Sequence, residues 1–243
     1  MSEQKVALVT GANKGIGFEI AAGLGASGFS VGVGARDSLR REEAVSRLRE
    51  RGVDAFGVAL DVTDDSSVAA AAAAVEERWG RLDSLVNNAG ITGGMPQNPI
   101  GVDLDIVRAV VETNVLGVIR VTNAMLPLLL RSPSPRIVNL SSSVGSLTRQ
   151  AGAGSATTTG PVAVAYAPSK TFLNAVMLQY VQELAGTDVL VNAACPGFVA
   201  TDLNGHRGIR TPEQGAATAI RLATLPDGGP TGGFFEDDGV IPW

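Results

Sequence analysis

The stretch Val6-Ala-Leu-Val-Thr-Gly-Ala-Asn-Lys-Gly-Ile-Gly17 decides the fold of this chain. Its four leading apolar residues predict a short strand buried on both faces. Glycines follow at positions 11, 15 and 17, and residues 18–24 have the apolar spacing of a helix. A strand, a glycine turn and a helix bring backbone N–H groups against a phosphate. We expect Gly11 to allow the tight turn, Gly15 to let the backbone approach a pyrophosphate, and Gly17 to bring helix and strand together. A tight turn without a ligand is the alternative, because Gly-x-x-x-Gly-x-Gly is not the commoner spacing.

Apolar strand patterns and helical patterns alternate along nearly the whole chain. Such alternation means parallel strands joined by right-handed helical crossovers. We therefore expect an α/β fold, in which a doubly wound (Rossmann-type) parallel sheet of about seven strands carries helices on both faces. No break in composition marks a boundary, so residues 1–243 are expected to form a single domain. The expected strands are 6–9, 30–35, 53–60, 82–87, 136–140, 188–194 and 232–235, and the expected helices are 18–24, 37–51, 64–79, 104–130, 165–184 and 211–225.

The composition narrows the class of protein. With 45% hydrophobic residues, a chain of 243 residues can bury a full core. A net charge of −5 without a basic tract argues against nucleic acid as a partner. The one cysteine, Cys195, excludes an intramolecular disulfide and fits a reducing compartment. Neither a signal peptide nor an apolar run of membrane-spanning length is visible, so we expect no membrane association and a cytoplasmic location.

The segments that directly follow the expected strands share a chemical character. Nearly all of them are polar or rich in glycine. In doubly wound sheets ligands bind beyond the carboxyl ends of the strands, so these segments predict a ligand site at that edge. They are residues 11–17, 35–36, 61–62, 87–90, 141–143 and 195–197.

The stretch Tyr166-Ala-Pro-Ser-Lys170 carries the candidate chemistry. Pro168 is tolerated only in a first helical turn, so a helix is expected to begin near residues 164–167. Positions i and i+4 share one helix face, which brings the Lys170 ammonium near the Tyr166 phenol. A nearby cation favours the phenolate, so we expect Lys170 to lower the pKa of Tyr166 toward neutrality, as general acid–base work requires. A solvated helix face, on which this spacing often occurs by chance, is the alternative.

Four motifs, taken together and in order, resemble the short-chain dehydrogenase/reductase family. They are the glycine turn, Asn87-Asn-Ala-Gly90, the serines that follow residue 140, and Tyr-x-x-x-Lys. The resemblance covers essentially the whole chain. It implies a catalytic tetrad of Asn114, Ser142, Tyr166 and Lys170. It further implies that the cofactor-binding residues are Gly11, Asn13, Lys14, Gly15, Ile16, Gly17, Arg36, Asp61, Val62, Asn88, Ala89, Gly90, Tyr166, Lys170, Pro196, Gly197, Val199 and Thr201.

Three of these assignments have neighbours that compete for the role. Side chains alternate along a strand, so Ser142 is preferred over the serines on either side of it. Asn87 is expected to serve the sheet, with Asn88 and Ala89 nearer the cofactor. Asn114 either positions a water that relays protons, as the resemblance implies, or is a polar residue that bends its helix.

Within the family, Asn13-Lys14-Gly-Ile-Gly17, Ala35-Arg36-Asp37 and the segment 229–235 look like the NADPH-dependent carbonyl reductases. The resemblance implies hydride transfer from NADPH to an aldehyde or ketone, with Tyr166 as proton donor. Ser142 would hold the carbonyl oxygen and Lys170 the nicotinamide ribose. NADP-dependent alcohol oxidation is the same reaction reversed, and a non-catalytic NADP-binding sensor is the alternative of another class.

The choice of NADP rests on charge. An acidic residue after the second strand would bind the ribose 2′-hydroxyl of NAD. Here Arg36 follows that strand and Lys14 lies in the glycine turn, and two cations suit a 2′-phosphate. Asp37 is expected to cap the next helix.

Two segments set the chain apart within the family pattern. From Ser142 to Tyr166 there are 24 positions, more than is usual in the family, so residues 145–165 are expected to form an inserted loop without a clear helical pattern. Residues 198–210 resemble the family's substrate lid. Residues 91–103, 145–165 and 198–210 would together build a pocket for a small, neutral carbonyl or alcohol. Monomeric carbonyl reductases carry a much longer insertion, so monomer and homo-oligomer both remain open.

Three isolated residues complete the expectations. His206 is interpreted as a surface loop residue rather than a substrate contact, and Cys195 as a core thiol. Trp243 either lines the pocket or packs on the last helix. A single histidine and a single cysteine predict no metal site.

Overall fold

The computed structural model describes residues 4–152, 162–237 and 239–243. One eight-stranded sheet runs through the molecule in the order β3-β2-β1-β4-β5-β6-β7-β8. The strands β1 to β7 are parallel, and β8 pairs antiparallel with β7 at the edge. The bounds are β1 (Val6–Thr10), β2 (Ser30–Ala35), β3 (Ala55–Ala59), β4 (Ser84–Asn87), β5 (Arg136–Leu140), β6 (Leu190–Ala194), β7 (Phe234–Glu236) and β8 (Gly239–Val240). The predicted doubly wound α/β domain is confirmed.

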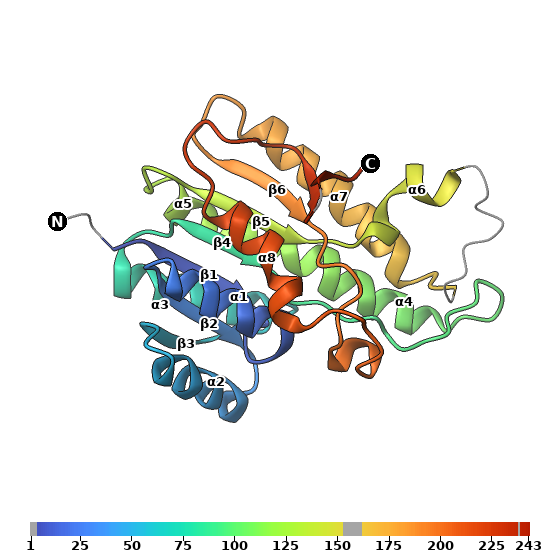
Figure 1. Ribbon diagram of the computed structural model, residues 1–243, viewed down its shortest axis with the longest axis horizontal. Coiled ribbons are helices and arrows are strands. Elements are labelled where there is room, and N and C mark those ends of the chain that lie inside the picture. Colours follow the sequence, from blue (N-terminus) through green and yellow to red (C-terminus); the bar gives the residue numbers. More distant parts are fainter. Residues whose placement is uncertain (1–3, 153–161, 238) are drawn as a thin grey trace.

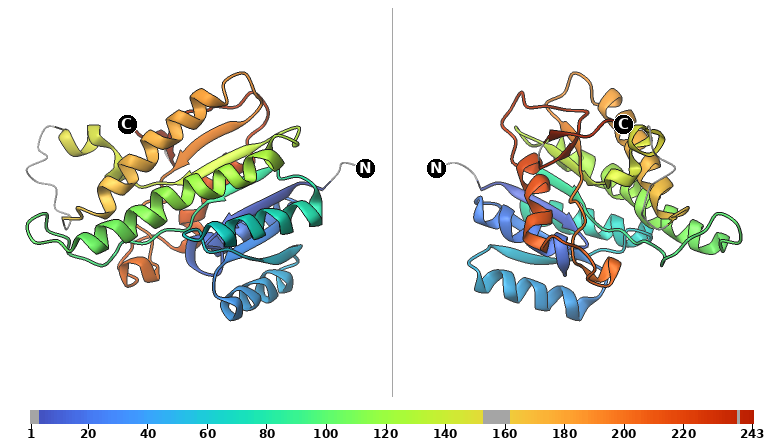
Figure 2. Two further views of the ribbon diagram at one scale, coloured as in Figure 1. Left: turned by 180° about the vertical axis from the view of Figure 1, so that it is seen from behind. Right: turned by 45° about the vertical axis from the view of Figure 1, so that its right-hand side comes forward.

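Helices cover both faces of the sheet (Figures 1 and 2). One layer consists of α1 (Gly15–Ala26), α2 (Ser38–Glu50) and α8 (Pro212–Ala223), and the other of α3 (Asp65–Trp79), α5 (Gly117–Leu129) and α7 (Tyr166–Glu183). The helices α4 (Leu104–Val111) and α6 (Leu147–Ala151) extend beyond the carboxyl ends of the strands (Figure 1). Within the described residues, no helix has the length and apolar character needed to cross a membrane.

The central strand β1 shows why the sheet carries two layers. Ala7 and Val9 belong to the hydrophobic cluster under α1, α2 and α8, whereas Val6 and Leu8 belong to the cluster under α3, α5 and α7. Successive side chains of a strand point to opposite faces, so an unbroken apolar run must be covered on both sides. The interpretation of the opening apolar run as a doubly buried strand is confirmed.

The expected helix 104–130 is in fact three consecutive elements. Helix α4 ends at Val111, a π-helical segment follows over Glu112–Leu116, and α5 continues from Gly117. A π segment inserts an extra residue into a helix and is frequent at functional sites. Asn114, a predicted member of the tetrad, lies in the middle of this segment.

Two smaller expectations are corrected. The sheet has eight strands rather than about seven, because the chain turns back after β7 and adds β8 to the edge. The inserted loop 145–165 was expected to lack helical structure, but Leu147–Ala151 forms α6, whose first turn is capped by the Ser146 hydroxyl. Residues 153–161 of that loop lie outside the described residues.

The strand order brings the predicted site segments together at the carboxyl-terminal ends of the parallel strands. The segments that follow β3, β2, β1, β4, β5 and β6 come in that spatial order. The order in which successive strands are added to the sheet reverses between β1 and β4, which are parallel neighbours although two strands separate them in sequence. Such a switch point is where doubly wound sheets bind ligands.

Candidate active site

The glycine turn has the backbone conformation that its sequence predicts. Gly11 and Gly15 have φ values of 65° and 56°, in the left-handed region that favours glycine. Gly17 is required by close packing, because a Cβ there would lie 2.5 Å from the Gly11 carbonyl oxygen and 2.4 Å from Asn88 Nδ2. The first helix therefore begins directly against the turn.

Hydrogen bonds between β1 and β4 hold this turn in place. The Thr10 hydroxyl accepts bonds from the backbone N–H groups of Asn88 and Ala89, both at 2.9 Å. The Asn88 side chain donates back to the carbonyl oxygens of Thr10 (2.8 Å) and Gly11 (3.2 Å). Asn88 thus ties the turn to the sheet. Thr10 was not among the predicted site residues, although a polar residue that ends an apolar strand was a signal for it.

Its neighbour Asn87 lies deeper in the fold. The Asn87 amide donates to Thr122 Oγ1 (3.1 Å) and to Asn139 Oδ1 (2.9 Å), and it links β4 to α5 and β5. Its Oδ1 atom is buried without a hydrogen-bond partner among the described residues. The expectation that Asn87 stabilises the sheet is confirmed, because its side chain bonds to residues of α5 and β5.

The N-terminus of α1 differs from those of the neighbouring helices. Asp37 caps α2 by accepting from the Arg40 N–H (2.9 Å), as expected, and Asp64 caps α3 through the Ser67 N–H (2.8 Å). For α1 no such side-chain cap exists within the described residues, and Lys14 occupies the N-cap position in an extended conformation. The first N–H groups of a helix need partners, and an anion can supply them.

Ser142, Tyr166 and Lys170 come from two separate places and converge. Tyr166 begins α7, Lys170 follows one helical turn later, and Ser142 comes just after β5. The Ser142 side chain interacts with the Tyr166 phenol and acts to lower its pKa. The Lys170 Nζ atom donates to the Leu140 carbonyl oxygen (2.7 Å) and lies 5.7 Å from the centre of the Tyr166 ring.

The serines beside Ser142 have other partners. Ser141 is buried and donates to Asn174 Oδ1 (2.6 Å), while Ser143 begins a short 3₁₀ turn. Of the three adjacent serines, Ser142 is the one whose side chain interacts with the phenol. This arrangement agrees with the expected alternation of side chains at the end of the strand.

Burial dominates the protonation equilibria of the converging groups. It raises the pKa of Tyr166 to about 12, with a smaller contribution from Cys195, while the interaction with Ser142 acts in the opposite direction. Burial also lowers the pKa of Lys170 to about 8. The expectation that Lys170 lowers the tyrosine pKa is therefore wrong for the protein groups taken alone. Removal from water disfavours the charged form of both side chains.

Asn114 is buried and engaged by hydrogen bonds on several sides. Its Nδ2 donates to the Ile91 carbonyl (2.9 Å) and to Ser169 Oγ (3.0 Å), and its Oδ1 accepts from the Ile91 N–H (2.9 Å). Oδ1 also lies 3.2 Å from the place where a Cβ on Gly90 would stand, and Lys170 Nζ lies 3.7 Å from the same point. The π segment thus brings Asn114 close to the lysine.

The residues predicted to bind the adenine and ribose end follow β2 and β3. Arg36 is exposed, and its charge contributes to the lowered pKa of Asp61, after the larger contributions of two hydrogen bonds from Thr63. Val62 is buried and packs on the start of α5, where a Cβ on Gly117 would lie 2.9 Å from its Cγ2. The adjacent residues Asp61 and Val62 therefore differ. Asp61 is polar and partly exposed, whereas Val62 belongs to the core.

Lys14 has a protein partner that its sequence context did not indicate. Its Nζ contacts Asp202 Oδ2 at 2.5 Å, and the second oxygen of that carboxylate lies 2.8 Å from His206 Nε2. Both partners lie in the 198–210 segment, so an ion pair joins that segment to the glycine turn. The contact between Lys14 and Asp202 spans 188 positions of sequence.

The 198–210 segment folds back on itself over this turn. Main-chain bonds join Ala200 to Arg210 (2.8 Å) and Ile209 to Phe198 (3.0 Å). Thr201 Cγ2 lies 3.4 Å from the place where a Cβ on Gly15 would stand. The predicted residues Pro196, Gly197, Val199 and Thr201 lead from β6 to this position.

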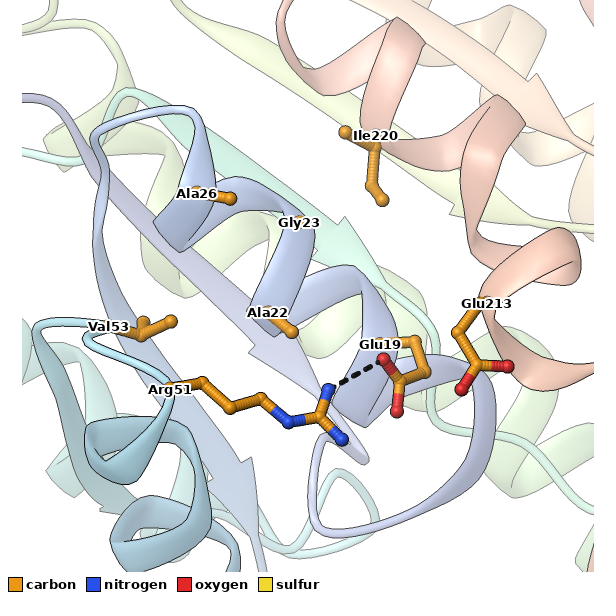
Figure 3. Close-up of a pocket in the computed structure, with 8 residues that line it drawn as sticks. All are labelled: Glu19, Ala22, Gly23, Ala26, Arg51, Val53, Glu213 and Ile220. Atoms are coloured by element: carbon orange, nitrogen blue, oxygen red, sulfur yellow. Dashed lines mark hydrogen bonds and ion pairs between the residues drawn. The ribbon is translucent and has the colours of Figure 1, made fainter.

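A separate groove of about 350 Å³ lies over α1 (Figure 3). Arg51 donates to Glu19 (3.0 Å) across it, and most of its wall is formed by small and aliphatic side chains. The predicted site residues belong to other parts of the fold. The lining residues are Glu19, Ala22, Gly23, Ala26, Arg51, Val53, Glu213 and Ile220.

The three isolated residues have clear positions. Cys195 is a buried free thiol, as expected, and His206 is exposed, as expected for a surface loop. The Trp243 ring stacks on Phe234 with centroids 5.5 Å apart, and its carbonyl accepts from the Thr148 N–H (2.9 Å). Trp243 therefore packs on β7 rather than on α8, the last helix, and its carbonyl holds the start of α6.

The glycine turn lies at the switch point of a doubly wound sheet, beside a convergent serine, tyrosine and lysine. This arrangement is typical of a nucleotide-dependent class of enzyme. The family model described as short chain dehydrogenase matches residues 5–210. The chain belongs to the short-chain dehydrogenase/reductase family of oxidoreductases.

Individual relatives cover nearly the whole chain. Short-chain dehydrogenase/reductase 1 of Saponaria officinalis is 34% identical over 298 positions, which include 100% of this chain and 97% of that protein. Carbonyl reductase [NADPH] 1 of Rattus norvegicus is 33% identical over 280 positions, with 100% and 99% covered. The structure of salutaridine reductase from Papaver somniferum superposes with a TM-score of 0.84 at 32% identity and covers 96% of this chain and 100% of that one.

Proposed function

We propose that the protein is a cytoplasmic, NADPH-dependent carbonyl reductase that converts small, neutral aldehydes or ketones to alcohols. The observation that carries the proposal is the convergence of Tyr166, Ser142 and Lys170 at the sheet edge that also holds the glycine turn. Tyr166 donates a proton to the carbonyl oxygen as negative charge develops there, and the Ser142 hydroxyl holds that oxygen. NADPH, when bound, supplies the hydride.

The residues present fit a dinucleotide. The N–H groups at the start of α1 lack a side-chain cap among the described residues. A diphosphate accepts hydrogen bonds from such groups and is favoured by the helix dipole. Asp61 and Val62 follow β3, and Ala89 and Gly90 follow β4, at the same end of the sheet. Asn13 and Ile16 lie within the turn itself.

Lys170 has two tasks in this proposal. It binds the nicotinamide ribose and it stabilises the phenolate that forms when Tyr166 gives up its proton. A buried amine whose pKa is about 8 can exchange protons near neutral pH, which suits it to return a proton to the tyrosine. Asn114 holds the relaying water next to this amine.

The preference for NADPH rests on Arg36 and Lys14. Arg36 is exposed next to Asp61, and its guanidinium can bind a 2′-phosphate in bidentate fashion. Lys14 reaches the same phosphate only when it leaves Asp202. A carbonyl reductase among the relatives carries NADPH in its name. The 198–210 segment acts as the substrate lid, since it covers the glycine turn through Thr201.

The decisive experiment compares Tyr166→Phe with Tyr180→Phe in a panel of aldehydes, ketones and diketones, with NADPH oxidation as the readout. These are the two tyrosines of the chain, and Tyr180 bonds to Asn123 and Ile119 on the α5 layer. We expect Tyr166→Phe to lose activity by roughly 100- to 10,000-fold while it still binds NADPH, and Tyr180→Phe to stay near the wild type. Retained turnover in Tyr166→Phe would refute the proton-donor role, and NADPH binding without turnover of any carbonyl by the wild type would favour a sensor.

A further inference from the structure

The helix that presents the proposed proton donor lacks a cap of its own. Helix α7 begins at Tyr166 with Ala165 in the N-cap position, and alanine has no side chain that could accept a hydrogen bond. The first N–H groups of a helix have no partner within the helix. The backbone at Tyr166 must therefore be held from elsewhere in the fold.

Gln97 supplies the missing partner. Its side-chain oxygen accepts from the N–H groups of Ala165 (3.1 Å) and Tyr166 (3.2 Å), although 69 positions separate it from the tyrosine. The same side chain donates from Nε2 to the Thr92 carbonyl at 2.6 Å. Gln97 is 3% exposed, so water does not compete for these bonds.

The main chain of Gln97 is docked to the same place. Its N–H donates to the Val162 carbonyl (2.9 Å), its carbonyl accepts from the Val164 N–H (3.2 Å), and it forms a parallel bridge with Ala163. Gln97 also lines a cavity of about 480 Å³ formed by residues 93–98, 100–103 and 106. The loop that builds this cavity is thereby attached to the chain that enters α7.

A second set of bonds reaches Tyr166 from its carbonyl side. Ser169 Oγ donates to the Tyr166 carbonyl (2.7 Å) and accepts from Asn114, which is bonded to Ile91. Ile91 precedes Thr92, the residue that Gln97 holds. The backbone of Tyr166 is thus fixed on both sides by one short segment after β4.

We infer that Gln97 is a positioning residue for Tyr166: it fixes the backbone of the tyrosine so that the phenol meets Ser142, and it couples the loop 91–103 to the proton donor. The inference rests on the proposed function, because it presumes that Tyr166 donates the proton. Gln97 itself touches neither substrate nor cofactor in this proposal. A small displacement of a reacting group costs catalysis far more than it costs binding.

The test uses Gln97→Met, which keeps the length of the side chain and removes its donor and acceptor. Gln182→Met is the matched control, because Gln182 is an exposed glutamine near the far end of α7. We expect kcat to fall roughly 10- to 100-fold in Gln97→Met. The Kd for NADPH should stay within about twofold, because the glycine turn lies elsewhere on the sheet edge. Gln182→Met should behave as the wild type.

Gln97→Glu provides the rescue and a safeguard if the methionine variant folds poorly. A carboxylate still accepts from both N–H groups and is favoured at a helix N-terminus, whereas its protonated form can also donate to Thr92. We expect this variant to recover at least about tenfold of the kcat that Gln97→Met loses. Equal kcat in Gln97→Met and Gln182→Met, or no recovery in Gln97→Glu, would overturn the inference.

Amide hydrogen exchange separates this inference from the proposed function. In the wild type the N–H groups of Ala165 and Tyr166 should be protected by Gln97, and in Gln97→Met they should exchange about tenfold faster. This readout needs no turnover. If the wild type reduces no carbonyl, the proposed function fails while the exchange rates still decide whether Gln97 holds Tyr166. Unchanged exchange rates of the Ala165 and Tyr166 N–H groups in Gln97→Met would refute the positioning role even if activity fell.

Discussion

The two ends of the proposed site are built in opposite ways. At the catalytic end, Lys170 is 5% exposed and donates to a main-chain carbonyl, and Tyr166 interacts with Ser142. At the phosphate end, Arg36 is exposed and the side chain of Lys14 is 53% exposed. Burial therefore governs one end, and surface charge governs the other.

The buried end therefore governs the proton transfer, and the exposed end governs which nucleotide is preferred. Proton transfer needs groups whose protonation and position are controlled by their surroundings, and burial controls both. Discrimination between two nucleotides needs only a charge that favours one of them, and an exposed side chain can supply it at little cost in stability. Substitutions at the buried end should thus change stability and rate together. Substitutions at the exposed end should change preference and salt dependence.

Lys170→Met should have the largest effect, and it tests the buried end. Because burial lowers the pKa of Lys170 from 10.5 to about 8, the unfolded chain keeps its proton between these values while the folded protein has released it. The free energy of unfolding of the wild type should then rise with pH, by about 2 kcal/mol from about pH 7.5 to about 9.5. This rise should be absent in Lys170→Met. Carbonyl reduction should fall by at least about 100-fold.

Denaturant unfolding at several pH values measures the first effect. Above pH 10, the raised pKa values of Tyr166 and Tyr180 lower stability in both proteins, so the comparison stays below that range. Lys5→Met is the matched control, since Lys5 is exposed. It should keep both the pH-dependent rise and the activity. The same rise in Lys170→Met would show that burial does not control this amine.

Arg36→Asp should have the next largest effect, and it tests the exposed end. Loss of a charge-assisted contact to a 2′-phosphate, and gain of an acceptor for a 2′-hydroxyl, should shift the NADPH-to-NADH ratio of kcat/KM by roughly 10- to 100-fold. Stability should hardly change. Arg40→Asp makes the same change of charge at the neighbouring exposed position 40 and should leave the ratio near the wild-type value. An equal shift in both variants would indicate a general charge effect instead of a contact.

Asp202→Asn should have the smallest effect, and it sharpens the comparison at the exposed end. The carboxylate pairs with Lys14 and holds it away from the proposed phosphate position. An exposed ion pair is worth at most about 1 kcal/mol, so NADPH should bind roughly two- to fivefold more tightly to the variant at low salt. The gain should shrink as salt is added.

Isothermal titration at two salt concentrations measures this gain. Asp105→Asn is the control, because Asp105 forms an exposed pair with Arg108 on α4. That variant should bind NADPH as the wild type does. Weaker binding to Asp202→Asn would mean that the pair with Asp202 prepares Lys14 for the nucleotide rather than competing with it.

Much of the fold was predictable from local patterns. The glycine turn, the cap at Asp37 and the proline at the start of α8 were each expected and are present. The interruption at Asn114 was not predictable, because a π segment leaves the apolar spacing on both sides intact. Strand β8 was missed as well, since two residues at a sheet edge carry no periodic signal.

Site residues were predictable where a motif names them, and less so where a contact defines them. Ser142, Tyr166 and Lys170 converge, although the direction of the tyrosine pKa was wrong. The charge of Lys170 suggested a lowered pKa for Tyr166. Desolvation of the phenol outweighs it in this structure, and desolvation depends on the whole surrounding fold.

The sequence by itself determined the α/β class, the conformation of the glycine turn and the order of the site segments along the chain. These follow from the period of the apolar residues and from backbone sterics, which act over a dozen neighbouring positions. Only the tertiary structure decided that Gln97 holds Tyr166 and that Asp202 holds Lys14. Those contacts join residues 69 and 188 positions apart, and folding alone brings such partners within hydrogen-bond distance.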